Sequence, residues 1–431
     1  MITGFKAENF RSIDELIQLS FDASTGIKDM EDKGYTIVAN SRVLNTIAFF
    51  GANSSGKSNV FKAIQRMRSI ILHSVRLNAG EQIPFDPFLL SDKPTCPTKF
   101  EIEFVDEHDK FKYGFSYTSS KIEREWLVAK FPRRSLKTLF ERGPEGIEID
   151  ETSFTEGAAI KDGNIQLNEN RLLISLAAQL GGKVSNRVIE WFLTKLRFAS
   201  GLNDRNYMQF TREYLHTNDE YKSEILHFIS SMDLGFSEVK TEREDLDERL
   251  LPKGLPAELI ATLREHPLII ASTVHNKYNA DGKIVGNVEF NIDEKESDGT
   301  KKLFNMAGPI IDTLKKGNSL FVDEMDAQLH PLLTRKIVAM FNCPKTNTKG
   351  AQLIFTTHDT NLLSRKQLRR DQIVFVEKDE KAKTRITPML EVKIAKGTKP
   401  RTDSNYEKNY LEGNYGAIPY FAKDFNVCED F

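Results

Sequence analysis

The chain has few cysteines and no long apolar run, and both features limit what it can be. Only Cys96, Cys343 and Cys428 occur among its 431 residues, an odd number without metal-ligand spacing. We therefore expect a reducing, cytoplasmic setting and neither a disulfide framework nor a zinc site. No stretch of about 18 apolar residues occurs, and the first residues lack the charged-then-apolar pattern of a signal peptide. No membrane segment is expected.

The chain also has no large excess of positive or negative charge. Its formal net charge of −2 provides no general attraction to nucleic acid. A local basic cluster at Lys130, Arg133, Arg134 and Lys137 could contact DNA phosphates, although an ordinary solvated surface is the simpler and favoured explanation. Sustained heptads and internal repeats are missing, so long coiled-coil arms are not expected. The length allows about two to three domains.

The most informative segment that is present is the glycine loop at residues 51–58, GANSSGKS. It follows the apolar run 46–50 and precedes helical spacing over 59–72, which is the strand–loop–helix context of a phosphate-binding loop. Lys57 is expected to bridge the β- and γ-phosphates of a nucleotide, and the Ser58 hydroxyl to bind Mg²⁺. The expected nucleotide contacts here are Asn53, Ser54, Ser55, Gly56, Lys57, Ser58 and Asn59.

A second apolar run, residues 320–322, ends in Asp323 and Glu324. Carboxylates at the carboxyl end of a strand project into the crevice where ligands bind in open α/β sheets. Asp323 is expected on the magnesium side, and Glu324 is expected to be the base that polarises the attacking water. A solvated acidic strand end is the simpler alternative.

Two smaller motifs follow the same order. The predicted strand 352–356 leads into His358, which could donate a hydrogen bond to the γ-phosphate. Ser297 and Gly299 precede a predicted helix about 25 residues before the acidic pair. Taken alone, Ser297 would be a helix cap.

The pattern predicts an α/β protein. Residues 2–10 are expected to form an edge strand, and the stretch that follows, to about residue 40, is expected to be loosely ordered. Further elements are predicted at 300–316 (helix), 319–322 (strand), 331–341 (helix), 352–356 (strand) and 371–377 (strand). The expected units are 1–98 (first half of an ATPase head, with the glycine loop), 99–150 (antiparallel β lobe), 151–290 (mainly helical insertion), 291–394 (second half of the head) and 395–431 (aromatic tail docked on a surface).

Together these motifs resemble the ABC-type AAA ATPases related to the OLD and RecF/SMC proteins. The resemblance covers nearly the whole chain, most weakly over 151–290, and the wider spacing is similar to the single-chain OLD-like AAA ATP-binding proteins. The segments that carry it are 9–12, 51–58, 83–88, 113–115, 297–300, 323–331, 356–359 and 415–419. The resemblance implies an ABC-type P-loop ATPase head with a mixed sheet.

It also implies roles for single residues. Lys57 and Ser58 match the Walker A motif, Asp323 and Glu324 match Walker B, Ser297 and Gly299 match the signature element, Asp326 lies in the D-loop region, His358 matches the switch histidine, and Arg11 matches an arginine that approaches the phosphates. Gln82 and Gln179 are both available as the Q-loop glutamine. In such ATPases two chains hold two ATP molecules, with Mg²⁺, head to tail, and the signature serine of one chain reaches the nucleotide of the other. A homodimer or higher homo-oligomer is implied.

Members of this branch often belong to bacterial anti-phage defence systems beside a separate effector, commonly a nuclease, as in RloA/RloB-like abortive-infection and PARIS-type pairs. The resemblance thus implies a sensor or regulatory ATPase with an effector in trans (possibly Toprim or RloB-like) and a phage-encoded trigger. The alternative is a RecF/SMC-like ATPase that binds DNA during repair. An intrinsic nuclease is not expected, because only 73 residues follow His358 and they lack a Toprim pattern.

Overall fold

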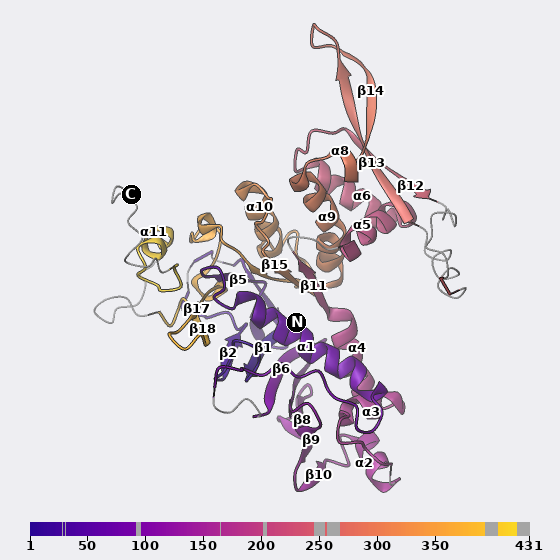
Figure 1. Ribbon diagram of the computed structural model, residues 1–431, viewed down its shortest axis with the longest axis vertical. Helices are drawn as coiled ribbons and strands as arrows, with labels where there is room; N and C mark the ends of the chain where they lie inside the picture. The colour runs from indigo at the N-terminus through magenta and orange to yellow at the C-terminus, as the bar shows by residue number, and fades with distance from the viewer. Residues whose placement is uncertain are drawn as a thin grey trace.

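The computed structural model describes residues 1–27, 29–30, 32–91, 96–163, 165–200, 205–244, 255–256, 268–392 and 404–419 (Figure 1). Two large β-sheets and the helices between and around them make up most of these residues. The predicted α/β class is confirmed. No helix among the described residues is long and apolar enough to cross a membrane.

The first large sheet is parallel except at one edge. Its order is β11 (Leu196–Ser200), β15 (Ser319–Asp323), β16 (Gln352–Thr356), β5 (Thr46–Phe50), β17 (Ile373–Lys378) and β18 (Thr384–Pro388). Only β18 runs antiparallel to its neighbour. All side chains of β5 and β16 are buried, as expected for parallel strands covered on both faces. The carboxyl ends of five strands therefore meet at one edge.

The second large sheet is an antiparallel meander with two N-terminal strands added to it. Its order is β10 (Gly146–Ile149), β9 (Lys137–Gly143), β8 (Ile122–Lys130), β7 (Asp109–Tyr117), β6 (Thr98–Asp106), β1 (Ile2–Glu8) and β2 (Ile17–Ser20). The prediction that β1 is an edge strand is wrong, because β2 pairs with its outer side. The alternation that buries Ile17 and Leu19 is only four residues long, so it was missed in the sequence.

Two hydrophobic cores lie on opposite faces of the parallel sheet. Helix α1 (Lys57–His73) fills the space between the two large sheets, where Phe49, Phe321 and Ile354 face it. On the other face, Phe50, Val322 and Phe355 pack against helices α9 (Asp298–Lys316) and α10 (Pro331–Asn342). The strands and helices predicted between 297 and 377 are present, with ends shifted by up to two residues.

Residues 151–290, predicted to be a mainly helical insertion, contain both helices and strands in their described part. Helices α2 (Thr155–Asp162), α3 (Leu173–Gln179) and α4 (Lys183–Lys195) belong to the first core, and β11 then joins the parallel sheet beside β15. Beyond it come α5 (Arg205–Thr217), α6 (Asp219–Ser230) and a three-stranded sheet of β12 (Glu238–Glu244), β13 (Leu268–Tyr278) and β14 (Ile284–Asn291). The β13–β14 hairpin projects from the molecule (Figure 1). Strand β11 was not predicted, because it has only five residues and its partner β15 lies more than 100 residues away in the sequence. The local pattern therefore gives no signal for it.

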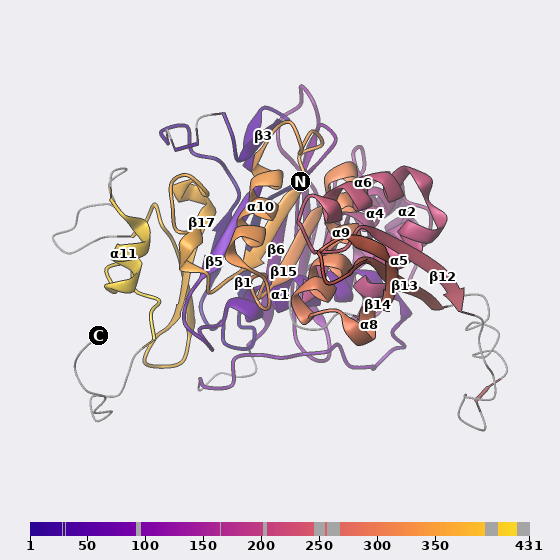
Figure 2. The ribbon, with the colours of Figure 1, turned by 90° about the horizontal axis from the view of Figure 1, so that it is seen from above.

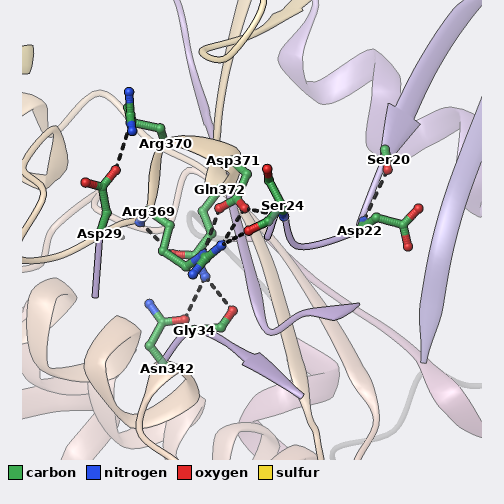
Figure 3. A network of polar contacts seen from close by, with 10 residues as sticks. All are labelled: Ser20, Asp22, Ser24, Asp29, Gly34, Asn342, Arg369, Arg370, Asp371 and Gln372. Atoms are coloured by element: carbon green, nitrogen blue, oxygen red, sulfur yellow. Dashed lines mark hydrogen bonds and ion pairs between the residues drawn. The ribbon is translucent and has the colours of Figure 1, made fainter. Parts of the chain in front are cut away.

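The described part of the stretch before residue 40 makes polar contacts with the buried residues Arg369, Asp371 and Gln372, so the prediction that it is loosely ordered is wrong there (Figure 3). Arg369 donates to the Ser24 carbonyl at 3.0 Å, and the Asp371 carboxylate accepts from the Ser24 amide at 2.9 Å. Gln372 donates to the Gly34 carbonyl at 3.0 Å, just before the small hairpin β3 (Tyr35–Val38) and β4 (Ser41–Leu44). These partners lie more than 300 residues apart in sequence, which is why the composition alone was misleading.

The last described segment, residues 404–419, contains the short helix α11 (Tyr406–Leu411). Tyr406, Tyr410 and Tyr415 are buried in the second core, as a docked segment requires. Tyr420, also part of the predicted aromatic tail, lies outside the described residues. In both views α11 and the β12–β14 sheet lie at opposite ends of the parallel sheet (Figures 1 and 2).

Candidate functional site

A cavity of about 450 Å³ opens where β5, β15, β16 and β17 end. This is the edge of an open parallel sheet at which ligands ordinarily bind. Its lining brings together the glycine loop, the acidic pair and the histidine: Asn53, Ser54, Ser55, Gly56, Lys57, Ser58, Asn59, Asp323, Glu324, Thr356, His358 and Lys378.

The glycine loop is shaped to receive an anion. At Gly51 a Cβ would lie 2.1 Å from the Val376 carbonyl oxygen, and at Gly56 it would lie 2.0 Å from Thr384 Oγ1, with φ at +106°. Side chains are therefore excluded at both positions. The helix α1 begins at Lys57 with no acid in its first turn, so its amides and its dipole favour negative charge. The buried hydroxyl of Ser55, in the cavity wall, has no hydrogen-bond partner in the described part of the chain.

Lys57 folds back onto the loop. Its Nζ donates to the carbonyls of Gly51 at 2.8 Å and Ala52 at 3.0 Å. Burial lowers the pKa of this ammonium, and the carboxylates of Asp323 and Glu324 partly offset that effect. A phosphate could replace the two carbonyls as the partner of a charged group that is already in place.

Thr356 connects the two carboxylate residues. Its hydroxyl donates to Asp323 Oδ1 at 2.7 Å and accepts from the Glu324 amide at 2.7 Å. The backbone of Glu324 has φ at +53°, a left-handed conformation that costs a non-glycine residue about 1–3 kcal/mol. The turn after β15 is thus held in a strained shape, and the Thr356 hydroxyl is one of the contacts that hold it.

Lys302 of helix α9 holds the same turn from the other side. Its ammonium donates to the carbonyls of Glu324 at 3.2 Å and Met325 at 3.0 Å, and also to that of Ala327. Burial lowers the pKa of Lys302 to about 8, against the opposing effect of nearby acids. At Gly299, in the first turn of α9, a Cβ would lie 2.7 Å from the Gln328 carbonyl oxygen. The first turns of α9 therefore pack tightly on residues 324–328.

Asp326 positions the segment that carries His358. Both oxygens of its carboxylate accept from the His358 amide, at 3.2 and 3.1 Å. Partial burial and, next, the Lys57 ammonium lower the pKa of the His358 imidazole below its ordinary 6.5, while Asp326 raises it less. The imidazole is therefore mainly neutral at pH 7 and has one N–H to donate.

Arg11 and Ser297 do not line the cavity of their own chain. Arg11 pairs with Asp86 at 3.5 Å, although its neighbour Ser12 accepts from the Asn59 side chain at 2.6 Å. Ser297 is exposed and caps α9 by accepting from the Thr300 amide at 3.2 Å. Neither Gln82 nor Gln179 is among the described residues that line the cavity, so the Q-loop residue is not identified.

Sequence reasoning missed Lys302, Lys378 and the linking role of Thr356. For Lys378 and Thr356 a signal existed, because each ends a strand next to β5 in the sheet and strand ends share one edge. For Lys302 there was none, since its contacts depend on how α9 packs.

The cavity could hold Mg²⁺ only together with a bound nucleotide, because the protein offers few ligands for it. Ser58 and Asp323 offer a hydroxyl and a carboxylate oxygen, which are the donors that Mg²⁺ prefers. The described residues contain no group of three or more His, Cys, Asp or Glu that could hold a metal ion. Protein sites of this kind complete the octahedron with substrate phosphates and water.

Comparisons with solved structures found SMC head domains among the matches. Solved structures with a similar arrangement include the SMC head domain from Thermotoga maritima, at 12% identity and a TM-score of 0.41, covering 90% of this chain and 98% of that chain. An Smc head bound to the C-winged helix domain of ScpA matches at 14% and 0.43, covering 90% and 97%. A Pyrococcus furiosus Smc head with an extended coiled coil, bound to the C-terminal domain of ScpA, matches at 12% and 0.43, covering 90% and 95%.

One protein family matches more than half of the chain. No curated protein matches the chain. Residues 47–364, which include the glycine loop, the acidic pair and His358, match the family described as "AAA domain, putative AbiEii toxin, Type IV TA system". The chain belongs to this family of AAA domains.

Proposed function

We propose that the chain binds and hydrolyses ATP with Mg²⁺. The observation that carries the proposal is the single cavity that joins Lys57 and the amino end of α1 to Asp323, Glu324 and His358. Its lining contains both the glycine-loop residues and the two carboxylate residues. These are the groups that transfer of a phosphoryl group to water requires.

Each residue has a part in the proposed reaction. Lys57 and the loop amides bind the β- and γ-phosphates, and the Glu324 carboxylate accepts a proton from the attacking water. His358 donates an N–H to the γ-phosphate. Mg²⁺, held by Ser58 and Asp323, would neutralise charge on the phosphates.

ATP turnover by the purified chain tests the proposal. Lys57→Ala should lose ATP binding, because the cation that meets the phosphates is gone. Glu324→Gln should keep binding and lose turnover by about 10²–10⁴-fold, the usual contribution of a general base. Turnover by Glu324→Gln at the parental rate would show that another residue activates the water, and a parental chain that binds ATP without turnover would be a nucleotide-dependent scaffold.

The active form is proposed to be a head-to-tail homodimer, or a higher homo-oligomer built on it. Ser297 is exposed at the amino end of α9 and lies outside the cavity of its own chain. The nearby loop that carries Asp326 is also partly exposed. In a head-to-tail pair, Ser297 and Gly299 of one chain would complete the γ-phosphate site of the other.

The proposed role is that of a sensor or regulatory subunit in anti-phage defence, with a separate effector and a phage-encoded trigger. The effector would be a nuclease, possibly Toprim or RloB-like. Support comes from the family description, which names a toxin of a toxin–antitoxin system. Plaque counts on cells that carry the chain with its neighbouring genes test this: protection should require Lys57, and equal plaque counts with Lys57→Ala would contradict it.

DNA binding is the second candidate, favoured by one observation. Lys130, Arg133 and Arg134 are exposed at the turn between β8 and β9, whereas Lys137 is paired with Asp150 at 2.6 Å. Phosphate contacts by these three side chains would make DNA affinity fall with salt, with a slope that decreases when all three are changed to Ala. No binding at low salt would remove this candidate.

A further inference from the structure

The last described segment, residues 404–419, contacts the start of the glycine loop at Ala52; we call it the closing segment. The Ala52 amide donates to the Ala417 carbonyl at 3.0 Å. Ala52 directly follows Gly51, where the chain leaves β5 and turns into the loop. Because this contact is between backbone groups, it constrains the backbone conformation at the start of the loop.

The Ala417 carbonyl is itself held in place. Tyr410 Oη donates to it at 3.1 Å, and the Ala417 amide donates to Glu377 Oε2 at 2.9 Å. Ala417 has φ at +58°, and a Cβ on Gly416 would lie 2.7 Å from the Glu377 carboxylate. The acceptor for Ala52 is thus fixed by one contact from α11 and one from β17.

Aromatic packing anchors the same segment on strands β5 and β17. The Tyr410 ring stacks on Phe375, with centroids 5.5 Å apart and planes at 13°, and meets Phe50 edge-on at 6.3 Å. Tyr415 packs on Phe375 at 5.3 Å. Phe50 is the residue immediately before the glycine loop, so the packing and the Ala52 contact act on neighbouring residues.

A second attachment reaches the segment that follows β16. Thr360 Oγ1 donates to Glu407 Oε1 at 2.7 Å, two residues beyond His358. The closing segment therefore contacts both the glycine loop and the histidine segment, the two parts of the chain that face the γ-phosphate in the proposed mechanism. If the closing segment only shielded Phe375 from water, the ring contacts would be explained. The hydrogen bond with Ala52 would not be needed for that role.

We propose that the closing segment positions the glycine loop for nucleotide, so that its docking and nucleotide binding stabilise each other. The proposal rests on the proposed function. Its physical reason is linkage: if docking favours the loop shape that accepts phosphate, bound phosphate must favour docking by the same factor. Tyr410, Glu377 and Gly416 are positioning residues in this scheme, and none of them touches the cavity.

A pair of matched variants on α11 tests the proposal. Tyr410→Phe removes the hydroxyl that holds the Ala417 carbonyl and keeps the stacked ring. Tyr406→Phe removes a buried hydroxyl that has no partner in the described part of the chain, so it is the control. Titration with a fluorescent ATP analogue and Mg²⁺ should show affinity about 3- to 10-fold weaker for Tyr410→Phe, the size of one net hydrogen bond. Tyr406→Phe should bind like the parent.

Proteolysis measures the reciprocal effect. Mg²⁺–ATP should slow protease cleavage within the closing segment of the parental chain, and should not slow it in Lys57→Ala. Gly416→Ala, which crowds Glu377, should be cleaved faster and bind more weakly. Equal affinity for the parent, Tyr410→Phe and Gly416→Ala would overturn the inference while leaving the proposed function intact. A parental chain that binds no ATP would overturn both.

Discussion

At the scale of single residues, the Thr356 hydroxyl has more contacts with the proposed machinery than its position in the sequence indicates. It orients Asp323 by donating to its carboxylate and holds Glu324 by accepting from its amide. A buried hydroxyl with one donor and one acceptor partner can do both at once. Removing it leaves a backbone amide without a partner in a strained turn.

Thr356→Val should therefore lower turnover more than ATP binding. Leaving a buried donor unsatisfied costs about 1–3 kcal/mol, and each 1.36 kcal/mol of transition-state stabilisation is about tenfold in rate. We expect kcat to fall by about tenfold or more. Thr356→Ser keeps the hydroxyl and is the control; if both variants turn over ATP alike, the link between the two carboxylates has no catalytic role.

His358 should titrate below its ordinary pKa. Partial burial and the Lys57 ammonium both disfavour the imidazolium. Because the unfolded chain then binds more protons just below pH 6.5, the His358 contribution to the free energy of unfolding should rise with pH through that window. NMR titration, with the signal assigned by His358→Gln, should place its pKa below 6.5, and Lys57→Met should move it upward. An unchanged pKa in Lys57→Met would contradict the proposed proximity.

At the scale of elements, helix α9 is bound to the turn after β15. Lys302 satisfies three carbonyls of residues 324–327, and Gly299 packs against Gln328. Ser297, the proposed trans contact, caps the same helix. A displacement of the amino end of α9 would therefore be transmitted to the turn that carries Glu324.

Lys302→Met should lower both stability and turnover while leaving ATP binding close to parental. One buried and two partly buried carbonyls lose a charged donor, so we expect the free energy of unfolding to fall by about 1–3 kcal/mol. Lys301→Met is the matched control, because within the described part of the chain that ammonium makes only a pair with the exposed Asp298, at 3.8 Å. Denaturant unfolding and ATP turnover of the two variants measure the difference. Equal stability would mean that Lys302 does not hold the turn.

Lys302 also predicts a pH dependence with a definite sign. Its pKa is about 8 in the folded chain and ordinarily 10.5. The unfolded chain therefore binds more protons between these values, so the Lys302 contribution to the free energy of unfolding rises with pH across that window. Unfolding measured from pH 8 to 10.5 should show a smaller rise in Lys302→Met than in the parental chain.

At the scale of the whole molecule, the head-to-tail arrangement predicts complementation between two inactive variants. Lys57→Ala damages the cavity, and Ser297→Arg crowds the proposed contact on the partner. In a mixed pair, one of the two sites has a normal Lys57 and a normal Ser297. Mixing the variants should restore part of the ATP turnover that each lacks. Ser297→Asn, which keeps a helix cap, should stay more active than Ser297→Arg.

One result would contradict the head-to-tail arrangement. If Ser297→Arg alone pairs upon ATP addition and turns it over at the parental rate, Ser297 does not complete a partner's site. Sedimentation of the parental chain with and without ATP provides the assembly state independently.

The elements that sequence patterns predicted well are those whose signal is local. The run 46–50, the glycine loop and α1 follow one another in sequence, and buried apolar residues at helical spacing mark α1. The predictions that were wrong concern strands whose pairing depends on distant parts of the chain. β1 was mistaken for an edge strand, and β11 was hidden in a helical region, because each depends on a partner strand that the local pattern does not identify.

By itself, the amino-acid sequence determined the residues that could hold phosphate and activate water, because glycine geometry, a helix start and strand-end carboxylates act over a few neighbouring positions. Only the tertiary structure decided how they are supported: Lys302 under the Glu324 turn, Thr356 between two carboxylates, and the closing segment against Ala52. Such contacts join side chains and carbonyls from distant parts of the chain, and their specificity lies in packing geometry, which residue spacing does not encode.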